Sequence, residues 1–328
     1  MPNWPSNETN YKINDLQIIR IPGKLSYQYS NKLITKLHSH LDFLDHTRVY
    51  LDYVNKIEIP DKYYDIILSF SDPNASHVFA YKLIQTKKFQ YGRWIQHWGD
   101  PITGDFTRNY WWPDWFVKLY ERSLIRKADK AVYVTPFTYD LLVSEHPSLI
   151  KKLAFAPLPA DMLPSVNKIE SKVLHVSYLG DYNPRIRNLR PLYEACANKK
   201  DIRLTIAGHG PKYADCDNVK VLSRIPHDQV RVIENESDVL ACICNLTGCM
   251  IPGKITYKSS TNKHILVALE DDNYEAMKAY FESYKRYIIC RNTVDSISEA
   301  LNSLRGKEAN YTTPYQLLPT TVAQKIIE

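Results

Sequence analysis

The chain has 328 residues, a length that suits two globular domains of about 150 residues each. Its 24% of charged residues is ordinary for a globular protein, no stretch approaches the roughly 20 apolar residues of a membrane span, and the N-terminus has no signal-peptide pattern. The net charge of +6 is modest, and no arginine-rich tail or RNA-binding motif accompanies it, so we expect no nucleic-acid partner.

The first half of the chain alternates short apolar runs with segments of helical spacing. Strands are predicted at 16–21, 64–70, 93–98, 130–135 and 152–157. Helices are predicted at 25–44, 75–87 and 115–128. Strands that are apolar along their whole length and separated by helices indicate a parallel sheet covered on both faces.

A proline-rich stretch, 157–171, interrupts this alternation and predicts a linker. The alternation then starts again, with strands predicted at 172–180, 202–208, 219–223, 238–245, 264–270 and 286–290. Helices are predicted at 188–199, with Asn188 as the capping residue, and at 227–236, 254–262, 273–284 and 294–305. The chain ends in a short tail helix.

This order predicts an α/β protein with two doubly wound, Rossmann-like domains. The predicted division is 1–160 for the first domain, 161–171 for the linker, 172–310 for the second domain and 311–328 for the tail. Ligands of such sheets bind beyond the carboxyl ends of the strands, so we expect the site in the central cleft between the domains.

Aromatic residues gather in the run Tyr110–Phe116, which contains three tryptophans. Amphipathic rings suit the faces of sugars and also the interface of a membrane, and a packed loop is the alternative. The six cysteines form no C-x-x-C pair, so we expect reduced cysteines of a cytoplasmic protein and no metal site.

The loop after the strand 172–180 carries Gly180, Arg185 and Arg187 and leads into a helix near Asn188. Two guanidinium groups beside a helix start suit a diphosphate, and a solvated basic loop is the alternative. Gly208 and Gly210 follow the next strand and allow either close approach of a ligand or a tight turn. Gly253 and Lys254 form a similar anion-binding feature at the start of the helix 254–262. The absence of a G-x-G-x-x-G pattern argues against a nicotinamide enzyme.

Several segments, in the same order, resemble bacterial glycosyltransferases of the GT-B fold. They are YDIILSFSDPNASHVFAYKL (64–83), RWIQHWGDP (93–101), ERSLIRKADKAVYVTPFT (121–138), SYLGDYNPRIRNLRPLYEA (177–195), IRLTIAGHGP (202–211) and IPGKITYKSSTNKHIL (251–266). The match runs from about residue 60 to 300 and looks nearest to the family 4 type of retaining enzymes in cell-surface polysaccharide biosynthesis.

The resemblance implies transfer of a hexose-like sugar from a nucleotide-diphosphate-sugar to a polysaccharide or lipid-linked acceptor, with no cofactor and no metal. It places His97 and Asp100 near the reacting sugar, as candidate catalytic residues; a structural histidine is the alternative for His97. The donor-binding residues that it implies are Gly180, Arg185, Arg187, Asn188, Gly208, Gly210, Gly253, Lys254 and Tyr257.

The chain departs from the family pattern at four places. Tyr257 stands where relatives usually have a ribose-binding glutamate, Cys249 lies near a second expected glutamate, and Asp181 replaces an arginine. The start of the chain resembles the third element of the family, so a first βα unit is expected to be missing. Two rival functions therefore remain: a non-catalytic nucleotide-sugar binding module and a GT-B-like nucleotide-sugar epimerase. We expect a cytoplasmic protein with peripheral contact to the inner face of the membrane.

Overall fold

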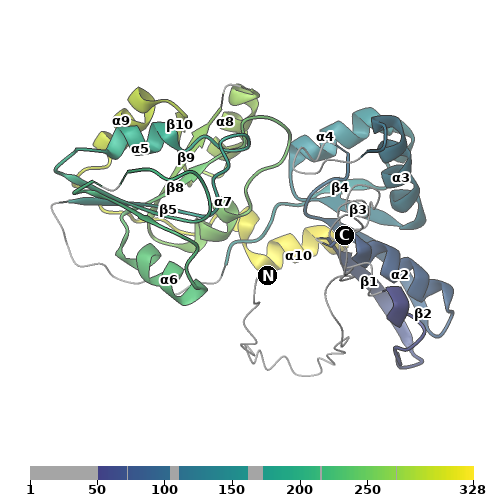
Figure 1. Ribbon diagram of the computed structural model, residues 1–328. Coiled ribbons are helices and arrows are strands. Elements are labelled where there is room, and N and C mark those ends of the chain that lie inside the picture. The colour runs from purple at the N-terminus through teal and green to yellow at the C-terminus, as the bar shows by residue number, and fades with distance from the viewer. Residues whose placement is uncertain (1–50, 72, 104–110, 162–172, 215, 271) are drawn as a thin grey trace, which may run out of the picture.

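The computed structural model describes residues 51–71, 73–103, 111–161, 173–214, 216–270 and 272–328, which form two α/β domains (Figure 1). The prediction of two domains with parallel sheets is confirmed. The strand predicted at 16–21, the helix predicted at 25–44 and most of the linker predicted at 161–171 lie outside the described residues.

The N-terminal domain contains a parallel sheet with strand order β1-β2-β3-β4. Its strands are β1 (Tyr63–Phe70), β2 (Gln90–Trp98), β3 (Lys130–Tyr133) and β4 (Leu153–Phe155). Its helices are α2 (Ala75–Gln85), α3 (Asp114–Lys127) and α4 (Pro136–Glu145). Phe70 pairs with His97, and His97 pairs with Val132, so these strands end at the same edge of the sheet.

The two faces of this sheet are covered by different parts of the chain. Because strands that follow one another in the same direction have right-handed crossovers, their connecting helices lie on one face. The other face is covered by the last helix, α10 (Pro319–Ile327), whose Val322 and Ile326 pack against Ile95 and Val132. The predicted tail helix is therefore part of the core of the N-terminal domain (Figure 1).

The C-terminal domain contains a six-stranded parallel sheet with the order β10-β9-β8-β5-β6-β7. Its strands are β5 (Leu174–Leu179), β6 (Ile202–Ala207), β7 (Val219–Leu222), β8 (Val239–Ile243), β9 (His264–Leu269) and β10 (Ile288–Arg291). Its helices are α5 (Arg190–Cys196), α6 (His227–Glu236), α7 (Lys254–Tyr257), α8 (Tyr274–Glu282) and α9 (Val294–Ser303). The order reverses between β5 and β8, and such a switch point opens a crevice at the carboxyl ends of the strands.

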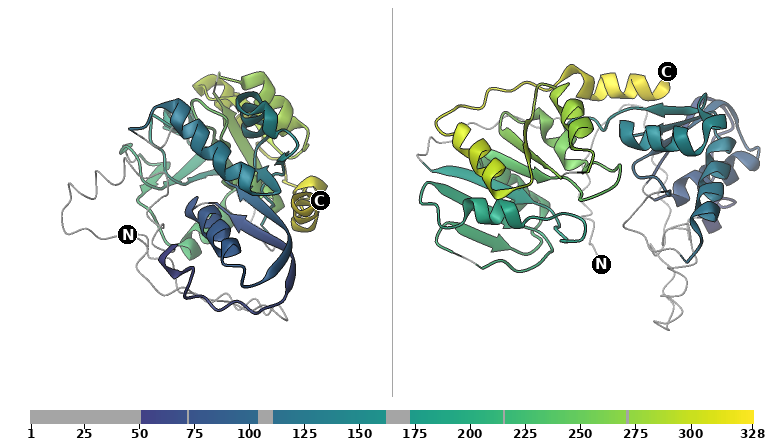
Figure 2. Two further views of the ribbon diagram at one scale, coloured as in Figure 1. Left: turned by 90° about the vertical axis from the view of Figure 1, so that its right-hand side faces the viewer. Right: turned by 90° about the horizontal axis from the view of Figure 1, so that it is seen from above.

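Helices cover both faces of this second sheet. The side chains of α5 and α9 pack into one cluster with β5 and β6, and those of α7 and α8 pack into another with β9. Figure 2 shows the two domains side by side, with α10 reaching from the second domain to the first. None of the helices that the structure describes is long and apolar enough to cross a bilayer.

Three local predictions need correction. The helix predicted at 254–262 is shorter, because α7 passes into a 3-10 turn at Lys258–Ser260 before the next strand. Asn188 precedes the N-cap residue Leu189, although its Oδ1 still accepts a hydrogen bond from the backbone N of Arg190 at 3.2 Å. Helix α4 was not predicted, although Thr135 caps it and proline follows as its first residue.

Candidate functional site

The carboxyl ends of the two sheets meet near α4 and the loop after β8. The hydroxyl of Thr135, which caps α4 by accepting from the backbone N of Thr138 at 3.0 Å, lies 2.9 Å from the carbonyl oxygen of Cys249. The rings of Phe137 and Tyr280 are in edge contact, with centroids 5.7 Å apart. These contacts hold the walls of the cleft together at one end.

Arg187 lies at the switch point of the C-terminal sheet. Its Nε donates to Oδ1 of Asn245 at 2.8 Å, and its Nη1 is 3.5 Å from the carbonyl oxygen of Asp181. Asn245 is buried and donates from Nδ2 to the carbonyl oxygen of Met250 at 3.0 Å. The loops after β5 and β8 thus hold the guanidinium group in a fixed orientation.

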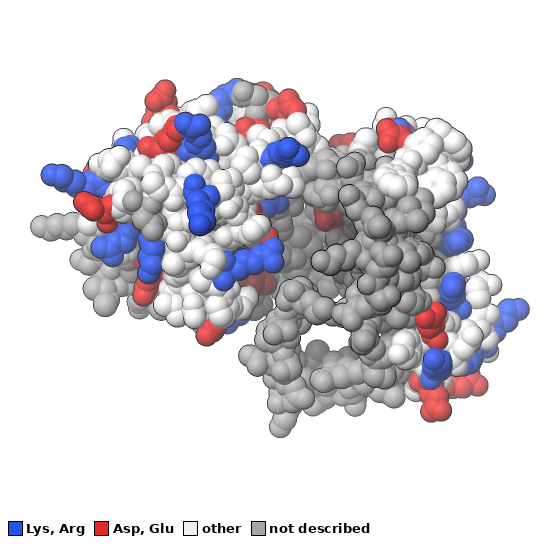
Figure 3. Space-filling model, viewed as in Figure 1, with Lys and Arg blue, Asp and Glu red and all other residues white. Residues whose placement is uncertain are grey.

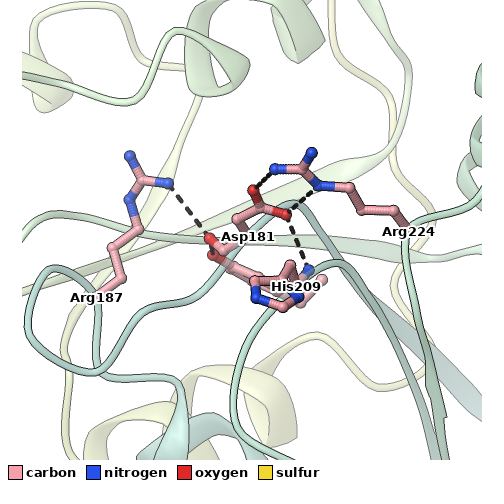
Figure 4. Close-up of polar contacts among 5 residues, drawn as sticks. Asp181, Arg187, His209 and Arg224 are labelled. Atoms are coloured by element: carbon pink, nitrogen blue, oxygen red, sulfur yellow. Dashed lines mark hydrogen bonds and ion pairs between the residues drawn. The ribbon is translucent and has the colours of Figure 1, made fainter. Parts of the chain in front are cut away.

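Asp181, which replaces the arginine of the family pattern, joins a second guanidinium group to this edge (Figure 4). Its carboxylate accepts two hydrogen bonds from Arg224, one of them from Nε at 2.9 Å, and a third from the backbone N of His209 at 2.9 Å. The hydrogen bond from Arg224 is the largest cause that lowers the pKa of Asp181. Because Arg224 is 43 residues away in the chain, nothing in the sequence pattern pointed to it.

Lys254 brings an amine to the same edge from the start of α7. Its Nζ lies 3.8 Å from the ring centroid of Tyr178 and 3.4 Å from the carbonyl oxygen of Leu179, below the turn at Gly180. Burial, more than any neighbouring charge, lowers the pKa of Lys254 to about 7. A bound anion would favour the charged amine, so this site is expected to take up a proton when it binds one.

The predicted glycines fall into two groups. A Cβ at Gly208 would stand 2.1 Å from the carbonyl oxygen of Gly180, and one at Gly210 would stand 2.3 Å from the ring of Tyr182. These two glycines therefore allow the loops after β5 and β6 to pack on each other. At Gly180, φ is +144° and the nearest atom to an added Cβ is Nζ of Lys254, at 3.0 Å.

The remaining predicted donor-binding residues lie around this edge. Arg185 is exposed, and the carbonyl oxygen of Asn188 accepts from Nδ2 of Asn292 at 2.8 Å. An added Cβ at Gly253 would meet Leu158 at 2.9 Å and the ring of Tyr257 at 3.2 Å. Tyr257, the predicted substitute for glutamate, is 39% exposed, and a tyrosine hydroxyl can donate or accept a hydrogen bond.

His97 is the last residue but one of β2, on the other side of the cleft. The side chain is buried against Phe70, with ring centroids 5.0 Å apart, and burial lowers the pKa of His97 to about 4. His77 lies behind it, with Nδ1 2.8 Å from Oγ of Ser69 and a pKa that burial lowers to about 3. Both imidazoles are neutral at pH 7, so His97 can donate or accept a hydrogen bond but carries no charge.

Asp100 follows β2 and is half-buried. Burial, and after it the charges of neighbouring carboxylates that include Asp100, raise the pKa of Tyr257. Burial is also the main cause that raises the pKa of Cys249, and the charge of Asp100 contributes to it. Asp100 therefore interacts electrostatically with both side chains. The structure therefore brings Asp100 near Tyr257, which the sequence placed in a different domain.

A buried carboxylate that was not predicted shapes the loop containing Asp100. Glu121 in α3 accepts from the backbone N of Ile102 at 3.0 Å, the backbone N of Thr103 at 2.8 Å and the hydroxyl of Tyr133 at 3.2 Å. Burial raises the pKa of Glu121. The only sequence signal for this buried carboxylate is that an acidic residue stands among the apolar positions of α3. Because a charged residue on a helix usually faces solvent, this signal does not predict burial.

Two other kinds of site, a metal site and a surface cavity, are conceivable among the described residues, and neither is a better candidate than the cleft. No group of three His, Cys, Asp or Glu side chains within the described ranges is arranged to hold a metal ion. A surface cavity of about 450 Å³ lies where β1 and β2 begin, and Tyr63, Phe89 and Tyr91 are among its lining residues. That position is at the amino ends of the strands, whereas ligands of parallel α/β sheets bind at the carboxyl ends.

The chain matches no protein-family model and no curated protein sequence. Solved structures do match its fold. The lipopolysaccharide outer core galactosyltransferase WaaB has a TM-score of 0.54 and 11% identity, over 91% of this chain and 81% of that one. HepE from Anabaena, solved in complex with UDP-glucose, has a TM-score of 0.50 and 11% identity, over 79% and 77%.

A further match is accessory secretory protein from Streptococcus pneumoniae, with a TM-score of 0.51, 11% identity and coverage of 86% of this chain. The chain spans only 55% of the length of that protein. At such identities the likeness concerns the fold alone. The chain has two parallel Rossmann-like sheets, and its fold matches that of WaaB over most of both chains. The chain therefore has the GT-B fold.

Proposed function

We propose that the chain is a glycosyltransferase that moves a sugar from a nucleoside-diphosphate sugar to a glycan or a lipid-linked acceptor, with retention. The observation that carries the proposal is the convergence of Arg187 and Lys254 at the switch point of the C-terminal sheet. Both cations lie at the carboxyl edge of β5, where an α/β sheet binds a phosphorylated ligand.

These cations suit the chemistry of a leaving diphosphate. Cleavage of the bond between sugar and phosphate develops negative charge on the diphosphate, and fixed donors stabilise that charge best where water is excluded. Asn245 holds Arg187 in orientation, and the turn at Gly180 leaves backbone space beside Lys254. This chemistry requires no metal, and we propose none.

On the acceptor side, a neutral His97 and the carboxylate of Asp100 would contact the transferred sugar or the attacking hydroxyl. Tyr257 would contact the donor in place of the usual glutamate. The names of two structural neighbours support the choice of substrates, since WaaB is a galactosyltransferase of lipopolysaccharide and HepE was solved with UDP-glucose. The resemblance of several sequence segments to the retaining family 4 type is the ground for proposing retention.

A two-stage experiment tests the proposal. Thermal denaturation with UDP, GDP, ADP, CDP and dTDP should show one or two nucleotides that raise the melting temperature, because a ligand that binds only the folded state stabilises it. The sugar derivatives of that nucleotide are then incubated with and without glycan and lipid-linked acceptors, and product is measured.

The outcomes separate the three candidate functions. Release of nucleoside diphosphate that increases with acceptor supports a glycosyltransferase. Interconversion of the sugar without acceptor indicates an epimerase, and binding without turnover indicates a binding module. Arg187→Ala should reduce turnover far more than it reduces stability, whereas equal losses of the two would argue against the proposed role of Arg187.

A further inference from the structure

Large apolar side chains are exposed together at the start of α3. The exposed fractions are 62% for Trp111, 37% for Trp112, 63% for Trp115 and 51% for Leu119. Single exposed hydrophobic residues are ordinary, but a contiguous group of this kind marks a surface that contacts something apolar. Three of the four are tryptophans, whose rings combine apolar area with a polar N–H group.

Trp115 and Leu119 lie on the outward face of α3, and Trp111 and Trp112 directly precede this helix. Val117, Leu124 and Ile125 bury the opposite face of α3 in the core of the N-terminal domain, so burial of that face leaves Trp115 and Leu119 outside. Figure 2 shows α3 along the side of the N-terminal domain that is turned away from the C-terminal domain.

Basic side chains continue the same helical face. Arg122 and Arg126 follow Leu119 by three and seven positions, which places them on the same side of the helix. Lys127 is exposed as well. The acidic Glu145 beside α3 is neutralised by Lys118, with 2.7 Å between Nζ and Oε1. The face therefore runs from the tryptophans, which have one exposed carboxylate, Asp114, among them, to the basic side chains near the end of α3.

The turn before β4 extends this face. Nη2 of Arg122 donates to Oγ of Ser148 at 3.2 Å, so the 3-10 turn Pro147–Leu149 lies against α3. Directly after that turn come Ile150, which is 50% exposed, and an exposed Lys151. Figure 3 shows a largely uncharged area over α3 and α4, with Lys and Arg side chains along its right edge and Asp or Glu side chains at its upper left.

We propose that this face, formed by Trp111, Trp112, Trp115, Leu119 and the neighbouring basic residues, docks on an anionic lipid bilayer. Tryptophan is the residue that concentrates at membrane–water interfaces, and basic residues beside it are attracted to anionic headgroups. A glycan would be held in a groove and offers no match for the aliphatic Leu119 and the positive rim.

The docking face is connected to the cleft through α3 itself. Glu121, one helical turn from Val117 on the buried side, accepts hydrogen bonds from the backbone N atoms of Ile102 and Thr103. The loop that contains Asp100 is therefore fixed to the same helix that would rest on the membrane. A bilayer bound there would place the N-terminal wall of the cleft close to lipid-linked acceptors.

Sedimentation with lipid vesicles tests the inference on the full chain. The chain should bind vesicles of phosphatidylcholine with about 30% phosphatidylglycerol more tightly than vesicles of phosphatidylcholine alone. Trp115→Ser combined with Leu119→Ser should weaken binding to the anionic vesicles about tenfold or more, and Arg122→Gln with Arg126→Gln should remove the preference for anionic lipid. The matched control, Val232→Ser with Tyr315→Ser, changes two apolar residues elsewhere that are 54% and 71% exposed, and it should leave binding unchanged.

A measurement on the unaltered chain guards against misfolded variants. Brominated lipids should quench the fluorescence of the exposed tryptophans, whereas the buried Trp94 and Trp98 stay unquenched. Failure to bind anionic vesicles, absence of quenching, or equal binding by the Trp115/Leu119 variant would overturn the inference. The inference would also be overturned if soluble glycans, and not lipids, quenched the fluorescence of the exposed tryptophans. It would be overturned as well if the Trp115/Leu119 variant lost self-association but kept its binding to vesicles. Because vesicle binding needs no donor, its failure is distinguishable from failure of the proposed glycosyl transfer.

Discussion

Nε of Arg187 donates a 2.8 Å hydrogen bond to Oδ1 of Asn245, and this contact joins the loops that follow β5 and β8. The two strands lie on either side of the point where the strand order reverses. Asn245 has no charge of its own, so it orients the guanidinium group without neutralising it. An aspartate at the same position would offer the same geometry and cancel the charge.

This difference yields the first prediction. Asn245→Ala should weaken binding of the stabilising nucleoside diphosphate about tenfold, because a hydrogen bond to a charged group contributes about 1.5–3 kcal/mol. Asn245→Asp should weaken binding at least as much although it keeps the hydrogen bond. Calorimetric titration measures both. If Asn245→Asp bound the diphosphate as well as the unaltered chain, Arg187 would not be a diphosphate ligand.

The second prediction concerns pH and Lys254. Because burial lowers the pKa of Lys254 to about 7, the amine is largely neutral above that pH in the absence of ligand. An anion favours the protonated form, so affinity for the diphosphate should fall as pH rises above about 7, and binding should take up protons. Titration calorimetry in two buffers of different ionisation enthalpy measures the uptake, which Lys254→Met should abolish.

The same shift affects stability with a definite sign. The unfolded chain keeps its proton on Lys254 up to about pH 10.5, whereas the folded chain loses it near 7. Between these values the unfolded state binds more protons, so this lysine opposes folding most below pH 7 and less as pH rises. Lys254→Met should therefore raise the free energy of unfolding more at about pH 6 than at about pH 9. An equal effect at both would contradict the shift.

The third prediction concerns Thr135, which caps α4 and contacts the loop after β8. Thr135→Val should lower the free energy of unfolding by about 1 kcal/mol through loss of the cap. It should also increase hydrogen exchange in the loop around Cys249, because the 2.9 Å contact to its carbonyl oxygen is lost. Thr135→Ser should restore both.

Thr293 provides the matched control for Thr135. It caps α9 in the same way, with Oγ1 accepting from the backbone N of Ser296 at 3.3 Å, but α9 lies in the other domain. Thr293→Val should cost similar stability and leave exchange near Cys249 unchanged. Equal exchange in both valine variants would show that Thr135 does not hold the cleft wall.

The fourth prediction concerns Glu121. Glu121→Ala would leave the buried backbone N–H groups of Ile102 and Thr103 without their acceptor, at a cost of about 3 kcal/mol or more. Urea unfolding measures the loss. Glu121→Gln keeps one acceptor oxygen and should lose less. A Glu121→Ala chain as stable as the original would show that the loop with Asp100 is held by other contacts.

The apolar runs of the sequence were enough to predict the strands of both sheets that the structure describes. Strands buried on both faces have a strong hydrophobic signal, as in Val239–Ile243, where every residue is buried. Helix α4 was missed although Thr135 and the proline after it are a helix-start signal. The signal is hard to recognise because the helix begins only a few residues after β3 ends.

The candidate site was predicted less completely, for a physical reason. Arg187 and Lys254 stand in recognisable local patterns, whereas the pairing of Asp181 with Arg224 depends on which strand edges become neighbours. That pairing spans 43 residues and follows from strand order rather than from local spacing. The role of Gly208 also depends on strand order, because a Cβ added there would meet the carbonyl oxygen of Gly180, which lies in a different loop.

The position of α10 makes the N-terminal domain discontinuous in sequence. Nζ of Lys130 donates to the carbonyl oxygen of Ile326 at 3.1 Å, and Arg93 donates to the carbonyl oxygen of Glu328 at 3.3 Å, so the helix is bound at its end as well as along its apolar face. A fragment that stops at the linker would expose Ile95 and Val132 to water. The two halves of the chain are therefore not independent folding units, and the last nine residues of helix complete the first domain.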